Sequence, residues 1–61
     1  MNKKFLLTYG FENMEGMEQT DYAWYETEED MKENIEDMKE YMKDFSVVEA
    51  IEILSLRIIK L

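Results

Sequence analysis

The stretch TEEDMKENIEDMKEYMKDF, residues 27–45, has the clearest secondary-structure pattern of the chain. Its apolar residues recur at spacings of four, three, four and three, which places them on one side of an α-helix. These residues are Met31, Ile35, Met38, Met42 and Phe45. Thr27 is a suitable N-cap, and Asp30 stands at the third position of a capping box. We therefore predict an amphipathic helix over residues 28–44.

Two strands are predicted before this helix. In residues 4–11 every second residue is apolar and falls on one face of a strand. The members of this face are Phe5, Leu7, Tyr9 and Phe11. Residues 12–19 are polar and contain a glycine, which predicts a hairpin loop. The aromatic residues that follow favour a second strand over residues 20–26.

Residues 47–61 predict the last strand, because they are rich in β-branched residues and contain no glycine or proline. Their apolar residues change faces near Leu54 or Ser55, which indicates either a β-bulge or a strand that is covered on both faces. Ser46 and Glu49 are also compatible with a short helical turn ahead of the strand. The start of this strand therefore stays open.

The expected architecture is a single α+β domain over residues 1–61 with the order β-β-α-β. A right-handed crossover returns the last strand beside the first, which gives a three-stranded antiparallel sheet of order 2-1-3. The helix packs on one face of this sheet. The chain has no Cys, so it lacks the disulfides that often stabilise small domains. We therefore expect a second chain, most simply in a homodimer, to cover the remaining apolar surface.

The charge predicts the kind of partner. The chain has 15 acidic and 7 basic residues, a formal net charge of -8, and its acids are most concentrated in residues 26–44. Phosphates repel such a surface, so direct binding to nucleic acid is disfavoured and a basic protein partner is expected. No segment approaches the roughly 20 apolar residues that span a bilayer. The first apolar stretch is interrupted at Thr8 and Gly10, too early for a secretory signal, so we expect a cytoplasmic location.

The residue types argue against catalysis. The chain has neither His nor Cys, and its two serines, Ser46 and Ser55, stand next to no available base. The acidic residues lack the spacing and the central glycine of a calcium loop. We therefore expect no enzymatic activity, no cofactor and no dedicated metal site.

One set of acidic residues forms a row along the predicted helix. Its members succeed one another at spacings of four, four, three and four, so neighbours stand about 5–6 Å apart. They are Glu29, Glu33, Asp37, Glu40 and Asp44. The row has two interpretations. It is either the solvated outer face of a helix, or a set of carboxylates that takes the place of backbone phosphates in a basic groove.

The methionines divide in the same way. Met31, Met38 and Met42 lie on the helical stripe, where packing against the sheet is the default role. Methionine also adapts well to partner surfaces, which keeps Met38 and Met42 as interface candidates. Met14 and Met17 fall in the predicted loop, where no core requires them, and are therefore the better candidates.

The C-terminal residues EILSLRIIKL, 52–61, resemble the closing strand of the small phage uracil-DNA glycosylase inhibitors. The shared pattern is an acid, aliphatic residues, a Leu-Arg pair and a final Lys. Size, acidity, the inferred element order and the aromatic strand at residues 22–26 are also similar. The resemblance implies a homodimer in the DNA-binding groove of the glycosylase. It further implies a pocket between the two helices that receives a DNA-intercalating side chain, with acids on either side. It assigns no pocket residue in this chain, because the helix does not match by sequence.

These observations lead to one functional prediction and two alternatives. The predicted function is that of a phage-type inhibitory DNA mimic that occupies the basic groove of a host or defence enzyme, most specifically uracil-DNA glycosylase. The first alternative is an inhibitor of the anti-CRISPR type, directed at a CRISPR nuclease. The second is a structural or regulatory homodimeric module whose acidic face is only solvated.

Overall fold

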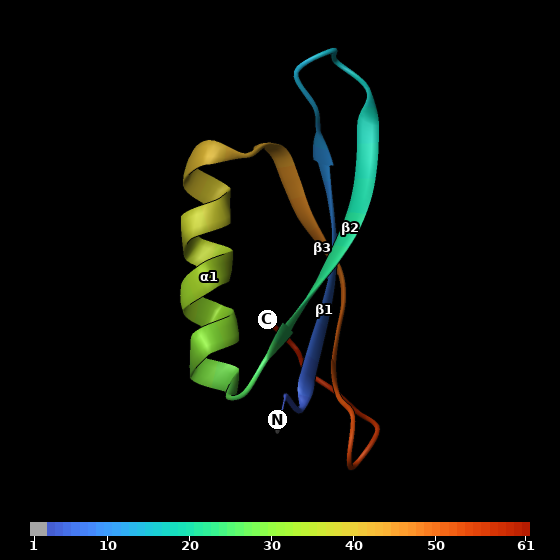
Figure 1. Ribbon diagram of the computed structural model, residues 1–61, viewed down its shortest axis with the longest axis vertical. Coiled ribbons are helices and arrows are strands. Elements are labelled where there is room, and N and C mark those ends of the chain that lie inside the picture. The colour runs from blue at the N-terminus through green and yellow to red at the C-terminus, as the bar shows by residue number, and fades with distance from the viewer. Residues whose placement is uncertain (1–2) are drawn as a thin grey trace.

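The computed structural model describes residues 3–61, which form a four-stranded antiparallel sheet and one helix. The elements are β1 (Phe5–Glu12), β2 (Glu18–Tyr25), α1 (Glu28–Tyr41), β3 (Lys43–Glu52) and β4 (Arg57–Ile58). The strand order is β2-β1-β3-β4, and α1 lies along one face of the sheet (Figure 1). The α+β class and the central position of β1 are confirmed. The prediction of three strands is wrong, because the short β4 pairs with the free edge of β3.

The first two strands form a regular hairpin. They pair without interruption from Phe5 opposite Tyr25 to Glu12 opposite Glu18. The connecting loop is shorter than predicted, because pairing leaves only residues 13–17 outside the strands. The Asn13 side chain closes this loop by accepting hydrogen bonds of 2.9 Å from two backbone N–H groups further along it. The hairpin tip projects beyond the end of α1 (Figure 1).

The helix starts where the sequence predicts and ends earlier. The Thr27 hydroxyl accepts a hydrogen bond of 3.1 Å from the backbone N–H of Asp30, which confirms the N-cap. The last helical residue is Tyr41, and Met42 is already extended. The predicted end at residue 44 is therefore wrong. β3 begins at Lys43, so Asp44, which has a φ of 52°, already belongs to the strand and not to another helical turn.

The predicted continuous strand over residues 47–61 is also wrong. β3 begins earlier than predicted and includes Ser46 and Glu49, so these two residues do not cap a separate helical turn. Residues 53–56 form a turn, in which the N–H of Leu56 donates to the carbonyl of Ile53 at 3.3 Å. This turn is the reason that the apolar residues change faces near Leu54.

Two register shifts do occur between β1 and β3, one near the start of β3 and one in its middle, and neither lies near Leu54. Thr8 of β1 stands opposite Glu49, whereas Tyr9 stands opposite Val47. Val48 therefore has no opposite residue, which is the arrangement of a β-bulge.

The core lies between α1 and the inner face of the sheet. Leu7 and Met31 are fully buried at its centre. The other buried side chains are Phe5, Tyr9, Ile35, Met38, Ala50 and Ile59. Phe45 packs against this cluster from β3, with its ring centroid 5.7 Å from that of Tyr9. The inner face of β1 predicted from alternation is thus confirmed.

Candidate functional site

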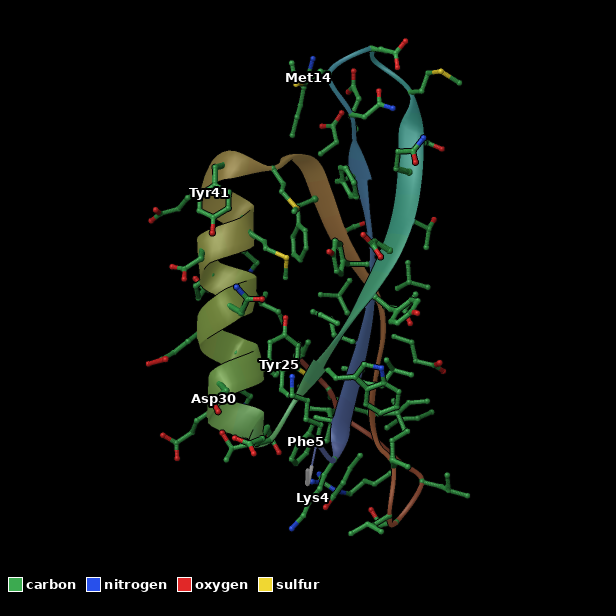
Figure 2. All side chains as sticks on the ribbon, viewed as in Figure 1. Lys4, Phe5, Met14, Tyr25, Asp30 and Tyr41 are labelled. Carbon is green, nitrogen blue, oxygen red and sulfur yellow. The ribbon has the colours of Figure 1, made fainter. Side chains whose placement is uncertain are left out.

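The acidic row lies on the side of α1 that faces away from the sheet. Glu29, Glu33, Asp37 and Glu40 are all exposed, and the helical period sets them opposite the buried stripe of Met31, Ile35 and Met38. Carboxylates project outward along this side of the helix in Figure 2. Asp44 is exposed as well, but it belongs to β3 and is not on the helix. We therefore define the α1 acidic row by its four helical members, and the predicted fifth position on the helix is corrected.

The ion pairs of the described residues leave this row unneutralised. Lys32 pairs with Glu28 at 3.0 Å and Lys39 pairs with Glu36 at 3.2 Å. The other pairs are Lys43 with Glu12 at 3.5 Å, Arg57 with Glu28 at 3.5 Å and Arg57 with Glu52 at 2.9 Å. None of these partners within residues 3–61 belongs to the α1 acidic row. The row therefore presents four negative charges with no cation bonded to them.

Glu28, on the same helix, differs from the row because cations neutralise its carboxylate. Its pKa is lowered, first because Lys32 donates a hydrogen bond to it, and also because of the positive charges of Lys32 and Arg57. Arg57 also bonds to Glu52, so this group ties the start of α1 to the end of β3. The role of Glu28 is thus internal to the fold, in contrast to that of the acidic row.

The basic residues of α1 gather on one flank of the helix. Lys32 and Lys39 border a shallow surface depression together with Lys60 of the C-terminal tail. On the opposite flank, towards β2, lie Asp30 and Asn34, and the Asn34 side chain accepts a hydrogen bond from the Tyr25 hydroxyl. The negative surface therefore extends from the row towards the β2 side and ends on the lysine side.

The four methionines predicted as partner contacts differ in how exposed they are. Met38 is only 4% exposed and packs in the core, so it is not available to a partner and its assignment to a binding surface is corrected. Met14 and Met17 are exposed in the hairpin loop, as their positions outside the core predicted. Met42 is partly buried and packs against the core from the C-terminal end of α1.

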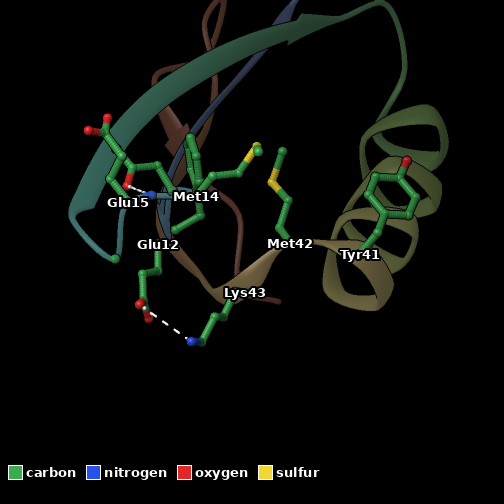
Figure 3. Close-up of a pocket in the computed structure, with 9 residues that line it drawn as sticks. Glu12, Met14, Glu15, Tyr41, Met42 and Lys43 are labelled. Atoms are coloured by element: carbon green, nitrogen blue, oxygen red, sulfur yellow. Dashed lines mark hydrogen bonds and ion pairs between the residues drawn. The ribbon is translucent and has the colours of Figure 1, made fainter.

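Met14 and Met42 meet at an open groove of about 910 Å³ between the hairpin loop and the end of α1. Figure 3 shows the two side chains pointing into the groove from its opposite walls, with the ion pair of Glu12 and Lys43 beside them. The lining residues are Phe11, Glu12, Asn13, Met14, Glu15, Gly16, Tyr41, Met42 and Lys43. The groove lies at the end of α1 near Glu40, where the acidic row stops.

Tyr41 is a surface residue that was not predicted from the sequence. Its side chain is 71% exposed beside the groove, although it stands within the apolar-rich end of the predicted helix. The signal was available in the helical period, since Tyr41 falls outside the stripe that contains Met38 and Met42. An aromatic residue off the buried stripe is a candidate contact for a partner.

Within residues 3–61, no three Asp or Glu side chains are arranged to hold a metal ion. Two tyrosines have a raised pKa, Tyr9 through burial and then the charge of Asp21, and Tyr25 through burial and then the neighbouring Tyr9. Both face the core side of the sheet, so these shifts concern stability.

No helix in the described part of the chain is long and apolar enough to cross a membrane. Comparisons with protein-family models, with curated proteins and with solved structures found no match to this chain.

Proposed function

We propose that this chain is a non-enzymatic, phage-type inhibitory protein that mimics DNA and inserts its α1 acidic row into the basic groove of a nucleic-acid-binding enzyme. The observation that supports this function is the row itself. Its four carboxylates are exposed on one side of a helix, and the ion pairs of the described residues all lie elsewhere.

The length and charge spacing of the α1 acidic row suit a groove that binds the phosphates of one DNA strand. Glu29 and Glu40 are eleven residues apart, which corresponds to about 16 Å along the helix axis. Four charges over this length give about one charge per 5 Å of axis, against one per about 3.4 Å for a single DNA strand. The row therefore imitates a short segment of one backbone, with four carboxylates over a length that holds about five phosphates, and a groove of matching length would recognise it.

Uracil-DNA glycosylase is the most specific target to test, and a CRISPR-type nuclease is the alternative. The resemblance that suggested the glycosylase lies in residues 52–61. In the structure these residues form a turn and the two-residue β4 instead of one closing strand. The support for inhibition therefore comes from the acidic row, and the choice of enzyme comes from the sequence resemblance. The proposed place of action is the cytosol of a bacterial host, where such enzymes act on DNA.

The test is inhibition of purified glycosylase on uracil-containing DNA. Wild-type protein in molar excess is expected to block cleavage. The triple variant Glu33→Gln, Asp37→Asn, Glu40→Gln removes three charges of the row. An exposed charge pair contributes about 0.2–1 kcal/mol, so the three together are expected to weaken inhibition by about 3-fold to 150-fold.

A matched control separates the row from net charge. The control variant is Glu18→Gln, Asp21→Asn, Glu26→Gln. It replaces the same residue types and removes the same number of negative charges, at exposed positions outside α1. It is expected to inhibit nearly as well as the wild type. Undiminished cleavage with the wild type would exclude the glycosylase as the target. A bacterial-lysate pull-down in which both triple variants retain the same partners would refute mimicry by the row altogether.

Salt dependence distinguishes this function from a structural or regulatory module with a solvated acidic face. Binding to a basic groove weakens as ionic strength rises, because salt screens the charges that attract the two surfaces. Contacts of a structural module made through apolar surface would not weaken in this way.

A further inference from the structure

The sheet face that looks away from α1 has a straight row of apolar side chains across all four strands. The register places Leu6 of β1 opposite Trp24 of β2 on one side and Ile51 of β3 on the other. Ile51 in turn stands opposite Ile58 of β4. Leu7, the chain neighbour of Leu6, is fully buried beneath α1. Because successive side chains of a strand point to opposite faces, Leu6 and the three residues in register with it point to the outer face.

Further apolar residues enlarge this surface. Tyr22 stands opposite Thr8 in the next outward-facing register position, and the bulged Val48 lies nearby in β3. We call the whole set the outer apolar face, and its members are Leu6, Tyr22, Trp24, Val48, Ile51 and Ile58. Four of them are substantially exposed: Trp24 at 41%, Tyr22 and Val48 at 63% each, and Ile58 at 64%. Leu54 and Leu56, in the turn before β4, are 78% exposed.

The exposed area is large for so small a chain. The four most exposed members of the outer apolar face together offer on the order of 500 Å², and the two turn leucines raise this towards about 800 Å². A standard protein interface covers about 800 Å² per partner. The largest apolar patch of an ordinary monomer is about 300–600 Å². The outer apolar face alone is thus within the range of an ordinary monomer, and together with the two turn leucines it approaches the area of a standard interface.

Charge favours one particular occupant. The six members of the outer apolar face are uncharged in a chain of net charge -8, and Glu49, opposite Thr8, lies among them between Val48 and Ile51. A basic partner would be attracted to the four carboxylates of the α1 acidic row in preference to this one. A second copy of the chain brings an equally apolar face, and each acidic helix stays in the layer away from the contact. Self-repulsion is thus weakest in this approach.

We propose that a second copy of this chain covers the outer apolar face, sheet against sheet, in a two-fold symmetric dimer. A two-fold axis parallel to the strands sets β2 of one copy over β4 of its partner, so that Trp24 packs on the partner's Ile58 and the contact repeats reciprocally. The large aromatic residue at one end of the row then meets the smaller aliphatic residue at the other end. The dimer does not depend on the proposed inhibitory function.

The first test is the mass of the protein in solution. Sedimentation equilibrium over a range of concentrations is expected to give a dimer of the 7.4 kDa chain. Ile58→Lys places a charge against the partner's Trp24 and is expected to weaken dimerisation at least about 100-fold. Met17→Lys is the matched control, because Met17 is 59% exposed but lies in the hairpin loop, and this variant is expected to dimerise normally. A wild-type monomer at concentrations up to about 1 mM, or equal effects of both variants, would overturn the proposal.

The second test fixes the arrangement. The chain has no Cys of its own, so the variant Trp24→Cys, Ile58→Cys introduces two thiols only. Within one chain they are three strand spacings apart, about 14 Å, whereas two packed sheets bring the position of Trp24 to about 10 Å from that of the partner's Ile58. Both distances are too long for a direct disulfide. A short bis-maleimide whose spacer bridges about 10 Å but not about 14 Å is therefore expected to give a covalent dimer, whereas each single variant stays uncrosslinked. Failure of the double variant to crosslink while its far-ultraviolet circular dichroism stays native would contradict the reciprocal contact.

A third measurement uses the only tryptophan of the chain. Trp24 is expected to lose water contact on dimerisation, so its emission should shift to shorter wavelength as protein concentration rises. Added salt should strengthen this shift, because it screens the repulsion between two chains of charge -8. Inhibition through the acidic row has the opposite salt dependence, so the failure of either proposal can be recognised independently. A shift that weakens with added salt would overturn the dimer.

Discussion

Two methionines of this chain test whether burial in the core determines stability. Met31 is fully buried under the sheet, whereas Met14 is fully exposed in the hairpin loop. Replacing a buried methionine by alanine removes packed atoms and leaves a cavity, which costs about 2–5 kcal/mol. A domain of 61 residues has a free energy of unfolding of about 3–9 kcal/mol, at roughly 0.05–0.15 kcal/mol per residue. Met31→Ala is therefore expected to remove between a quarter and all of the stability.

The measurement is urea denaturation followed by far-ultraviolet circular dichroism at one fixed protein concentration. A fixed concentration is needed because self-association adds stability by mass action. With a denaturant slope of about 1–3 kcal/mol per M, the midpoint of Met31→Ala is expected to fall by about 1 M or more. Met14→Ala makes the same chemical change and is expected to stay within about 0.5 kcal/mol of the wild type. Similar midpoints for the two variants would refute the assignment of Met31 to the core.

Three further predictions concern local features of the fold. Thr27→Ala removes the N-cap and is expected to lower the free energy of unfolding by about 1 kcal/mol, with Thr27→Ser restoring most of it in the same denaturation assay. Gly16→Ala is expected to cost about 1 kcal/mol, because the hairpin loop holds this residue at a φ of 80°. Since folding raises the pKa of Tyr25, the stability that this group contributes is fully present below about pH 10 and is lost as pH rises further. Tyr25→Phe should make that alkaline decline shallower in a series of unfolding curves, and an unchanged decline would show that Tyr25 does not cause it.

The sequence predicted the elements whose signals are local and unambiguous. The capping residue Thr27 identified the start of α1, and strict alternation identified the inner face of β1. The end of the helix was not predictable in this way. Met42 and Phe45 continue the helical spacing, yet both pack against the core after the chain has become extended. The spacing of apolar residues shows only which residues face the core. A helix continued to residue 45 and the extended chain that is present would both turn Met42 and Phe45 towards it.

The C-terminal region was mispredicted for a different reason. The turn over residues 53–56 contains Ile, Leu, Ser and Leu, and none of the usual turn residues Gly, Pro, Asn or Asp. Leu56 adopts a φ of 52°, a conformation that its sequence gives no reason to expect. Only the change of faces near Leu54 indicated an irregularity. An uncovered apolar surface was expected, but its full extent was not predictable, since the row across four strands depends on the pairing of β4 with β3.

The placement of α1 and the outer apolar face in opposite layers has a consequence for stoichiometry. In a sheet-to-sheet dimer the two helices lie in the outermost layers, about 30 Å apart, with their carboxylates directed away from each other. One groove could then engage only one of them. Such a dimer would be bivalent, bridging two enzyme molecules in a 2:2 assembly, and on a target that is itself clustered it would gain avidity without any additional contact.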